Sequence, residues 1–580
     1  MVTSRQHFRE KVSQMISWGH WFALFNILFS LVLGSRYLFA SDWPGSLFGR
    51  IYALVSWLGH FSFIVFTLYL LVIFPLTFVV MSQRLLRFIS AALATAGLTL
   101  LIFDSAIYAR FHLHLTPLVW DLVTNPEQGE RAREWQLMFI YIPAIFLVQM
   151  LYGTWSWQKL RSLNRQRFGK PLAAVFISAF VASHMMYIWA DANFYRPITM
   201  QRSNLPLSYP MTARRFLEKH GLLDSQEYQR RINQQGNPAA LSIEYPLNDL
   251  SYRDSGRGYN LLLLVVDGLG NTDITTDKMP FLESFAKNNI QFTQHFSTGM
   301  QNDTALFGLF YGISSGYLDG ILSSRKSSAL IDALTHQGYQ FGLFSSDGFQ
   351  TPLYRQALLT DYSLPNGARQ NDLITMKQWQ QWLNLRNNTT PWFSFLNING
   401  VSGPSDKIDK KALDAEFGQV LDSLKNKGIL DNTIIAITSK HGDTIIDHAP
   451  RWFIDNQFNR KQMHVPLIIH WPDTPAQTIN KLTGHQDIMT TLMQRLLHVS
   501  NAPSDYSQGE DLFSAQRNIP WLITGENGSL IVTTAQNTIY LSGDGEYHLY
   551  DLNGNDIRNA KPNLTQLLQI LTEIKRFLAN

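Results

Sequence analysis

The chain has 580 residues, a formal net charge of +4 at pH 7 and no cysteine. This length exceeds that of one ordinary domain, so at least two folding units are expected. Without cysteine there can be no disulfide, thiolate metal site or cysteine nucleophile, and any catalysis must use oxygen or imidazole groups. The basic residues form no nucleic-acid footprint, so we expect no nucleic-acid partner.

Five apolar stretches in the first 190 residues are long enough to cross a membrane, since ~20 helical residues span ~30 Å of hydrocarbon. They are Trp18–Phe39, Leu58–Val80, Leu86–Ile107, Gln136–Trp157 and Pro171–Ala190. The first is longer than the apolar region of a signal peptide and four more follow it, so we expect an uncleaved anchor. Residues 1–190 are therefore predicted to form a five-helix transmembrane domain.

The basic residues predict the orientation, because cytoplasmic loops carry an excess of lysine and arginine. Such residues precede the first stretch, separate the second from the third, and separate the fourth from the fifth. They are Arg5, Arg9, Lys11, Arg84, Arg87, Lys159, Arg161, Arg165, Arg167 and Lys170. We expect a multi-pass protein of a bacterial inner membrane, with a cytoplasmic N-terminus and everything after the fifth stretch in the periplasm.

Three ionisable residues lie inside these stretches: His60, Asp104 and His184. Ionisable groups within a membrane are costly and often functional. A structural role is favoured here, because Asp104 lies near a span end and a neutral histidine can hydrogen-bond a neighbouring helix.

Residues 191–244 form a basic juxtamembrane linker. Thr212 is predicted to cap a short helix, Ala213–His220, which Gly221 would end. The predicted phosphate-binding residues are Thr212, Arg214, Arg215 and Lys219. A helix start with two arginines beside it favours an anion, so we expect recognition of a phosphate-bearing lipid such as lipid A or cardiolipin. The alternative is a charged helix that is merely solvated.

Residues 245–580 alternate short apolar runs with amphipathic stretches. Predicted strands are Asn260–Val266, Gln340–Phe344, Trp392–Ile398, Thr433–Thr438 and Val465–Trp471. Predicted helices are Met279–Lys287, Ala329–His336, Met376–Arg386, Lys410–Lys427 and His485–His498. This alternation predicts an α/β domain with a mainly parallel sheet and helices on both faces.

Polar residues follow several of these strands, and ligands bind beyond the carboxyl ends of parallel strands. Asp267 follows the first strand, Asp347 comes shortly after the second, and Asn399 follows the third. Lys440 and His441 follow the fourth. A histidine directly after a buried strand has few packing reasons to be there.

Four segments together carry a family resemblance: NLLLLVVDG, HFSTGMQNDTALFGLFYG, FGQVLDSLKNKGILDNTIIAITSKHG and HVPLIIHWP. They resemble the sulfatase-like branch of the alkaline phosphatase superfamily, which includes lipoteichoic acid synthases and lipid A phosphoethanolamine transferases. The resemblance implies an alkaline-phosphatase/sulfatase-like α/β fold.

Active members of this superfamily bind a divalent metal that activates a threonine or serine nucleophile. By the resemblance, Asp267 and His441 take two of the metal-ligand positions. Lys440 stands where the family has a metal-binding aspartate, and Gln301 stands at the nucleophile position.

The departures matter because an ammonium cannot coordinate a cation and an amide has no ionisable oxygen with which to attack phosphorus. Thr298 or Thr304 would supply a hydroxyl if the register shifts by three residues. A phosphate-binding histidine of the transferases aligns with Ser402.

Two outcomes follow for this site. Lys440 either fills the metal position and pairs with Asp267, which is the favoured reading, or a residual site still holds an ion such as Mg, Mn or Zn. His448 and His464 are further histidines that could complete such a site. We therefore expect a pseudo-enzyme with a vestigial site and no certain cofactor; an active protein would be a metal-dependent phosphatase.

The whole layout resembles a family of enterobacterial inner-membrane proteins with five spans, a basic linker and a sulfatase-like domain. That resemblance implies a regulator that binds lipid A of lipopolysaccharide, or cardiolipin, at the periplasmic membrane face. It would act through its spans on LapB and so control degradation of LpxC by FtsH. The alternatives are a metal-dependent phosphatase or phospholipid-headgroup transferase, and cardiolipin binding with transport toward the outer membrane.

Overall fold

The computed structural model describes residues 2–116, 119–120, 140–400, 408–442, 460–526, 528–543, 546–557 and 562–579. The chain forms two compact units. The first comprises Met1–Arg230 and Pro238–Ala240, and the second comprises Arg231–Asn237 and Leu241–Ala579. The predicted linker, 191–244, is therefore divided between the units, with most of it packed in the first.

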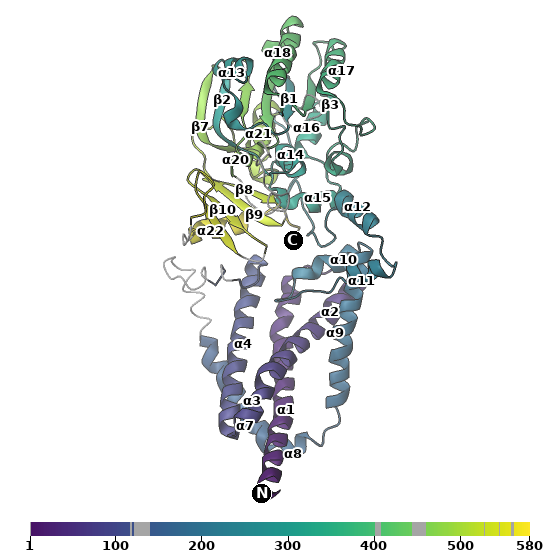
Figure 1. Cartoon of the computed structure of the whole chain (residues 1–580), viewed down its shortest axis with the longest axis vertical. Coiled ribbons are helices and arrows are strands. Elements are labelled where there is room, and N and C mark those ends of the chain that lie inside the picture. The colour runs from purple at the N-terminus through teal and green to yellow at the C-terminus, as the bar shows by residue number, and fades with distance from the viewer. Residues whose placement is uncertain are drawn as a thin grey trace. The chain divides into compact units, whose positions relative to one another are not determined.

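Long helices build the first unit (Figure 1). They are α1 (Val2–Ala40), α2 (Leu47–Leu68), α4 (Gln83–Phe111), α7 (Tyr141–Gln158) and α9 (Gly169–Ala192). A π-helical turn, Tyr69–Ile73, continues α2 into α3 (Phe74–Val79). Shorter helices are α8 (Leu160–Leu163), α10 (Arg196–Thr199), α11 (Arg214–Lys219) and α12 (Ser225–Gln235).

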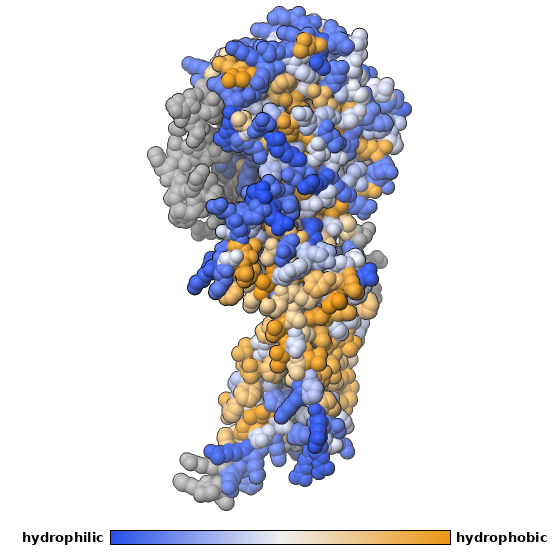
Figure 2. Space-filling view, turned by 90° about the vertical axis from the view of Figure 1, so that its right-hand side faces the viewer, coloured by the Kyte–Doolittle hydropathy of each residue, from blue (hydrophilic) through white to orange (hydrophobic). Residues whose placement is uncertain are grey.

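Four helical stretches of the described chain are long and apolar enough to cross a membrane. They are Gln6–Ala40, Leu47–Val79, Gln83–Phe111 and Gly169–Ala192, and they contain four of the five predicted spans almost completely. The remaining span, Gln136–Trp157, corresponds to α7, whose 18 residues rise ~27 Å; its positions 136–139 lie outside the described residues. Hydrophobic residues cover much of this unit's side in Figure 2. About four to five apolar helices therefore stand at the N-terminus.

Polar pairs join α7 to α1 inside the helix bundle. Asn26 and Gln149 exchange two hydrogen bonds of 3.1 and 2.9 Å. Trp18 Nε1 lies 3.0 Å from both Gly153 O and Ser156 Oγ. Such interhelical bonds are typical of helix contacts in membranes, so these pairs favour α7 as a further membrane helix.

The second unit is built around a seven-stranded sheet in the order β3-β4-β1-β5-β6-β2-β7. Its strands are β1 (Asn260–Val266), β2 (Ile290–Phe296), β3 (Gln340–Ser345), β4 (Trp392–Ile398), β5 (Thr433–Ser439), β6 (Leu467–His470) and β7 (Gln477–Gly484). β6 runs antiparallel to both of its neighbours, and the other pairs are parallel. This confirms the predicted mainly parallel sheet.

Helices cover both faces of this sheet, and β1 is therefore buried on both sides. Leu261, Leu263 and Val265 belong to one apolar core, and Leu262 and Leu264 to the other. The first core includes residues of α14 (Asn302–Tyr311), α16 (Ala329–His336) and α21 (His485–Thr491). The second includes residues of α13 (Pro280–Lys287), α17 (Asp372–Asn384) and α18 (Lys410–Asn426).

A smaller antiparallel sheet, which the sequence did not predict, follows in the same unit. Its order is β11-β10-β9-β8. The strands are β8 (Trp521–Glu526), β9 (Ser529–Thr534), β10 (Thr538–Leu541) and β11 (Tyr547–Tyr550). The described residues of this unit also form α15 (Leu318–Ser324), α20 (Arg460–Met463) and α22 (Leu564–Glu573).

Candidate functional site

Three charged residues meet at the carboxyl end of the large sheet. β1 and β5 are adjacent and parallel, with Val266 opposite Ser439, so the residues that follow them emerge side by side. These residues are Asp267 and Lys440. Asp347 joins them from the segment after β3.

Lys440 forms the centre of this cluster. Its Nζ lies 2.8 Å from Asp267 Oδ1 and 3.3 Å from Asp347 Oδ2, and its side chain is fully buried. Burial by itself would lower the pKa of Lys440, but the two carboxylates outweigh burial and raise it above its ordinary value. The lysine is therefore a permanent cation, and the expected pairing with Asp267 is present.

Hydrogen bonds also fix the Asp347 carboxylate beside this lysine. Asp347 Oδ1 accepts bonds from Ser345 Oγ and from Phe349 N, the latter at 2.8 Å. Asn397 Nδ2 in turn donates to Ser345 Oγ at 2.8 Å. The cluster is thus part of a connected network across β3 and β4.

The start of α14 lies beside this network. His441 Nε2 is 3.0 Å from Asn302 Oδ1, and its Nδ1 is 2.9 Å from Gly442 O. Gln301, the residue at the nucleophile position, is the exposed N-cap of α14 and makes no side-chain cap bond. Burial raises the pKa of Asp303 from its ordinary value, with Lys440 opposing that rise.

The two candidate threonine hydroxyls are both engaged. Thr304 Oγ1 donates a hydrogen bond to Glu526 Oε2 at 2.9 Å. Glu526 Oε2 also accepts a hydrogen bond from Met300 N at 2.9 Å. Thr298 Oγ1 lies 3.0 Å from Thr304 O and is buried. Burial raises the pKa of Glu526, whose carboxyl comes from β8 of the smaller sheet.

The linker forms a different kind of site in the first unit, and it corrects two predictions. α11 begins at Arg214 after Ala213, whose φ of 51° is left-handed, and no side chain caps it. Thr212 is therefore not the N-cap. The Arg214 guanidinium is already engaged, because its Nε and Nη2 each donate a hydrogen bond of 2.8 Å to the Asp191 carboxylate. Gly221 follows the helix with φ of 68°, as predicted.

Arg215 and Lys219 remain exposed on α11. Around them the linker presents large apolar side chains to solvent. These are Leu207 (88% exposed), Tyr209 (81%), Met211 (55%), Phe216 (58%) and Leu222 (69%). Exposed apolar groups beside cations are a pattern typical of membrane-surface binding. We call residues 207–222 the linker surface.

The ionisable residues of the spans hold this linker in place. His60 Nε2 lies 2.7 Å from Pro206 O, and His184 Nδ1 accepts Met211 N at 3.2 Å. Asp104 accepts bonds from Tyr37 OH at 2.6 Å and from His114 Nδ1 at 2.7 Å, and His114 Nε2 lies 2.8 Å from Ser203 O. All three residues are thus hydrogen-bonded within the protein, as the structural alternative expects. The histidines' partner is the linker backbone, however, and not a neighbouring helix.

Comparison with known proteins identifies the family. The chain is 58% identical to inner membrane protein YejM of Salmonella typhimurium over the whole of both chains. This chain belongs to the YejM family. It is also 43% identical to an uncharacterised protein of Haemophilus influenzae, over 94% of each chain.

Two family descriptions divide this YejM-family chain. Residues 5–252 match a domain of unknown function, DUF3413, and residues 259–407 and 410–499 match the Sulfatase family. Among solved structures, a Vibrio parahaemolyticus protein of the alkaline phosphatase superfamily has 16% sequence identity and a TM-score of 0.45, covering 58% of this chain and 89% of that one. The chain is thus an inner-membrane protein of the YejM family with a sulfatase-like α/β domain.

The residues present do not fit the divalent metal that the superfamily implies. Asp267 is paired with the Lys440 ammonium, which repels a second cation by several kcal/mol at ~4 Å. Both ring nitrogens of His441 already face oxygen atoms. Among the described residues no three His, Asp or Glu side chains are grouped to hold a metal. His464 is committed to Thr293 O at 2.9 Å, and His448 and Ser402 lie outside the described residues.

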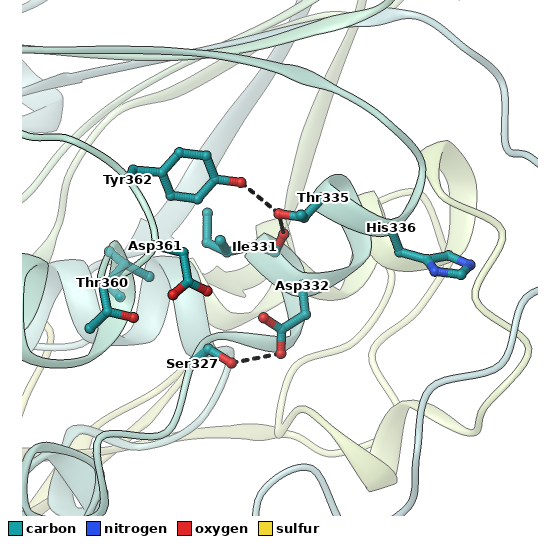
Figure 3. A pocket seen from close by; sticks show the side chains of 9 residues that line it. Ser327, Ile331, Asp332, Thr335, His336, Thr360, Asp361 and Tyr362 are labelled. Atoms are coloured by element: carbon teal, nitrogen blue, oxygen red, sulfur yellow. Dashed lines mark hydrogen bonds between the residues drawn. The ribbon is translucent and has the colours of Figure 1, made fainter.

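A separate cavity of about 260 Å³ opens beside α16 and carries none of this chemistry (Figure 3). Asp332 and Asp361 line it, and Asp332 accepts a bond from Ser327 at 2.7 Å. Thr335 and Tyr362 share a bond of 2.6 Å. Burial raises the pKa of Asp332. None of the predicted site residues lines this cavity.

The sequence placed Asp347 among the polar residues that follow the strands but gave it no role, and it did not single out Asn302 or Glu526. An acidic residue shortly after β3 was a visible signal for Asp347. Asn302 and Glu526 gave none, because one begins an unpredicted helix and the other ends a strand of the unpredicted sheet.

Proposed function

We propose that this chain is a non-catalytic inner-membrane regulator of lipopolysaccharide homeostasis. Its linker surface binds lipid A of lipopolysaccharide at the periplasmic membrane face. The bound state is passed through the spans to LapB, which controls degradation of LpxC by FtsH. In this proposal the chain crosses the membrane several times, with its N-terminus in the cytoplasm and its sulfatase-like domain in the periplasm.

The composition of the linker surface carries this proposal. Leu207 and Tyr209 are more than four-fifths exposed, which is unfavourable in water and favourable among acyl chains. Arg215 and Lys219 stand beside them as exposed cations. An amphiphile with phosphate groups on an acylated base satisfies both halves of this surface, whereas a soluble anion satisfies only the cations.

The anchoring of the linker supports transmission to the spans. Three histidines hydrogen-bond its backbone. His60 contacts Pro206 and His184 contacts Met211. His114, which is paired with Asp104, contacts Ser203. A ligand that displaces the linker must break or shift these bonds, and each sits on a different membrane helix or at its end. The spans are therefore mechanically coupled to the lipid site.

The buried ion cluster supports regulation over catalysis. Lys440 occupies the centre of the superfamily's reaction site and pairs there with Asp267 and Asp347. A metal-dependent phosphatase or headgroup transferase needs that position for an ion. Phosphoester turnover by the purified chain that disappears with Asp267→Ala would overturn the non-catalytic assignment.

The decisive experiment measures lipopolysaccharide binding to the full chain in detergent. Arg215→Ala with Lys219→Ala should weaken binding by about thirtyfold, because each of the two cations near a lipid phosphate contributes ~1 kcal/mol. The control is Lys411→Ala with Lys425→Ala, which removes two exposed lysines from α18 of the sulfatase-like domain. Equal affinity of the two double variants would remove the linker from lipid recognition.

A competition experiment with cardiolipin distinguishes the lipopolysaccharide sensor from the alternative of cardiolipin binding and transport. If cardiolipin competes with lipopolysaccharide at equal phosphate concentration, the surface is a general anionic-lipid site and transport toward the outer membrane becomes the better assignment. If lipopolysaccharide binds at least tenfold more tightly, the sensor assignment stands.

A further inference from the structure

A second lipid-sized site lies in the first unit, away from the linker. A cavity of about 940 Å³ opens between α1, α2 and α9, near the top of the ~300–1,000 Å³ range of ligand pockets. Phe63 and Phe180 close its inner end by stacking at 4.3 Å between ring centroids. Beyond them Gly59 allows α2 and α9 to touch, since a Cβ there would lie 2.6 Å from Phe180 Cα. We call this cavity the α1–α9 groove.

The groove is as deep as one leaflet of a bilayer. Its lining on α9 runs from Lys170 to Phe180, and its lining on α1 runs from Ser17 to Ile27. Ten residues of helix rise ~15 Å, which is half of the ~30 Å hydrocarbon core. The groove therefore reaches from one membrane surface to the bilayer midplane.

The mouth of the groove is basic, and its position is fixed. Arg167 and Lys170 line it and are exposed. In the described part of the chain no carboxylate pairs with either of them. Asn164 ties the loop that carries Arg167 to α1, because its Oδ1 accepts Ser17 Oγ at 2.8 Å and Trp21 Nε1 at 3.0 Å.

We propose that the α1–α9 groove binds an anionic phospholipid from the leaflet on the N-terminal side of the membrane. The phosphate group lies between Arg167 and Lys170. One acyl chain runs along the aromatic wall toward Phe180. This site is separate in space from the linker surface, which follows the opposite end of α9.

The charges favour a lipid over a membrane helix of another protein. Phe63 and Phe66 remain 46% and 45% exposed, so this wall is apolar and needs cover. A helix would cover it without using the two cations, whereas basic pockets between membrane helices on the cytoplasmic side match anionic headgroups. An acyl chain also fills an irregular aromatic groove by bending, without the close backbone approach that helix pairs favour.

An occupant of the groove would brace α9 against α1 and α2. The other end of α9 carries Asp191, the residue that holds Arg214 of the linker. The proposed lipid is thus placed to stabilise the helix that anchors the linker surface.

The test uses the full chain in a neutral detergent and native mass spectrometry with added phosphatidylglycerol or phosphatidylcholine. Phosphatidylglycerol should bind at least tenfold more tightly than phosphatidylcholine. Arg167→Ala with Lys170→Ala should remove most of that preference. The matched control is Arg161→Ala with Arg165→Ala, two arginines of the same connection that do not line the groove; it should retain the preference.

A second pair of variants tests the apolar part. Ala173→Trp fills the groove and should lower the binding of phosphatidylglycerol about tenfold, whereas Ala174→Trp, one residue along and outside the lining, should not. Equal binding of phosphatidylglycerol by the two tryptophan variants would overturn the proposal. So would an equal preference for phosphatidylglycerol in the two double alanine variants. A photo-crosslinker can also be placed at position 173 and activated in membranes. If it captures a polypeptide, and added phosphatidylglycerol does not reduce the yield of that product, the proposal is overturned in favour of a partner helix.

Discussion

Two groups of basic residues in this protein have opposite surroundings. Lys440 has no exposed side-chain surface and two carboxylates within 3.3 Å, whereas Arg215 and Lys219 are exposed beside apolar side chains. A buried ammonium must be neutralised internally, because desolvation costs several kcal/mol. An exposed cation among exposed apolar groups is available to an outside ligand. The position of the superfamily's metal is thus filled by an internally paired cation, whereas the exposed cations lie on the linker surface.

Arg214 is the intermediate case. Its side chain is 37% exposed, yet its guanidinium makes two hydrogen bonds to Asp191, whose side chain is 3% exposed. Tyr228 OH lies 3.2 Å from both oxygens of the same carboxylate. The Asp191 hydrogen bond is the largest contribution that raises the pKa of Arg214. This arginine therefore positions the linker and is engaged within the protein, unlike the exposed Arg215 and Lys219.

The largest effect is expected from Lys440→Met. This change leaves the buried Asp347 and the partly exposed Asp267 without their cation, which should destabilise the sulfatase-like domain by about 3–5 kcal/mol. Thermal unfolding of the full chain in detergent measures the loss. Lys377→Met, at an exposed position of α17, should change stability by less than about 0.5 kcal/mol. Similar melting temperatures for the two variants would show that water reaches the cluster.

A smaller loss is expected from Asp191→Asn. Removing this carboxylate frees Arg214 and should cost about 2 kcal/mol, less than a fully buried pair because the guanidinium is partly solvated. Hydrogen exchange of residues 203–222 should become faster. Glu227→Gln breaks an exposed pair with Arg230 and serves as the control; exchange as slow in Asp191→Asn as in this control would mean that other contacts hold the linker.

Salt should separate the two groups of cations. Raising the ionic strength from 0.1 M to 1 M shortens the screening length from ~10 Å to ~3 Å, so binding of lipopolysaccharide to the linker surface should weaken severalfold. The buried Lys440 cluster is shielded from salt, and the melting temperature should not fall in parallel. Salt-independent binding would indicate that apolar contacts alone carry recognition.

The last effect depends on pH and concerns Glu416, a buried carboxylate with which no Lys or Arg of the described residues pairs. Burial, followed by Asp372 and Asp409, raises the pKa of Glu416 to about 7. An acid whose folded pKa exceeds its unfolded value of ~4.3 binds more protons in the folded state, so stability falls as pH rises between these values. Glu416→Gln should therefore raise the melting temperature more at pH 8 than at pH 5. An equal change at both pH values would contradict the raised pKa.

Much of the fold could be predicted because buried parallel strands are continuous apolar runs. The predicted bounds of β1 and β4 match the structure. β2, with the sequence IQFTQHF, and β7, with QTINKLTG, were missed because polar residues interrupt them. The antiparallel sheet β8–β11 was missed for a related reason: short half-buried strands give a weak pattern that only their partners complete.

The site was predictable only in part. The pairing of Asp267 with Lys440 was the favoured of the two outcomes that the family resemblance left for this site, and it is present. The contact of Asp347 depends on the strand order, which places β3 two positions from β1. The bond between Arg214 and Asp191 joins residues 23 apart, and the left-handed Ala213 that displaces the predicted Thr212 cap has no sequence signal.

The sequence by itself determined the apolar helices of the first unit and the α/β class of the second. These are properties of composition and local pattern, which act over one helix or one strand, whereas the departure at Lys440 was visible only through the family resemblance. The tertiary structure alone decided which charges are neutralised and which stay available. That decision depends on the distance between residues far apart in the chain and on their exclusion from water, and neither is written in local sequence.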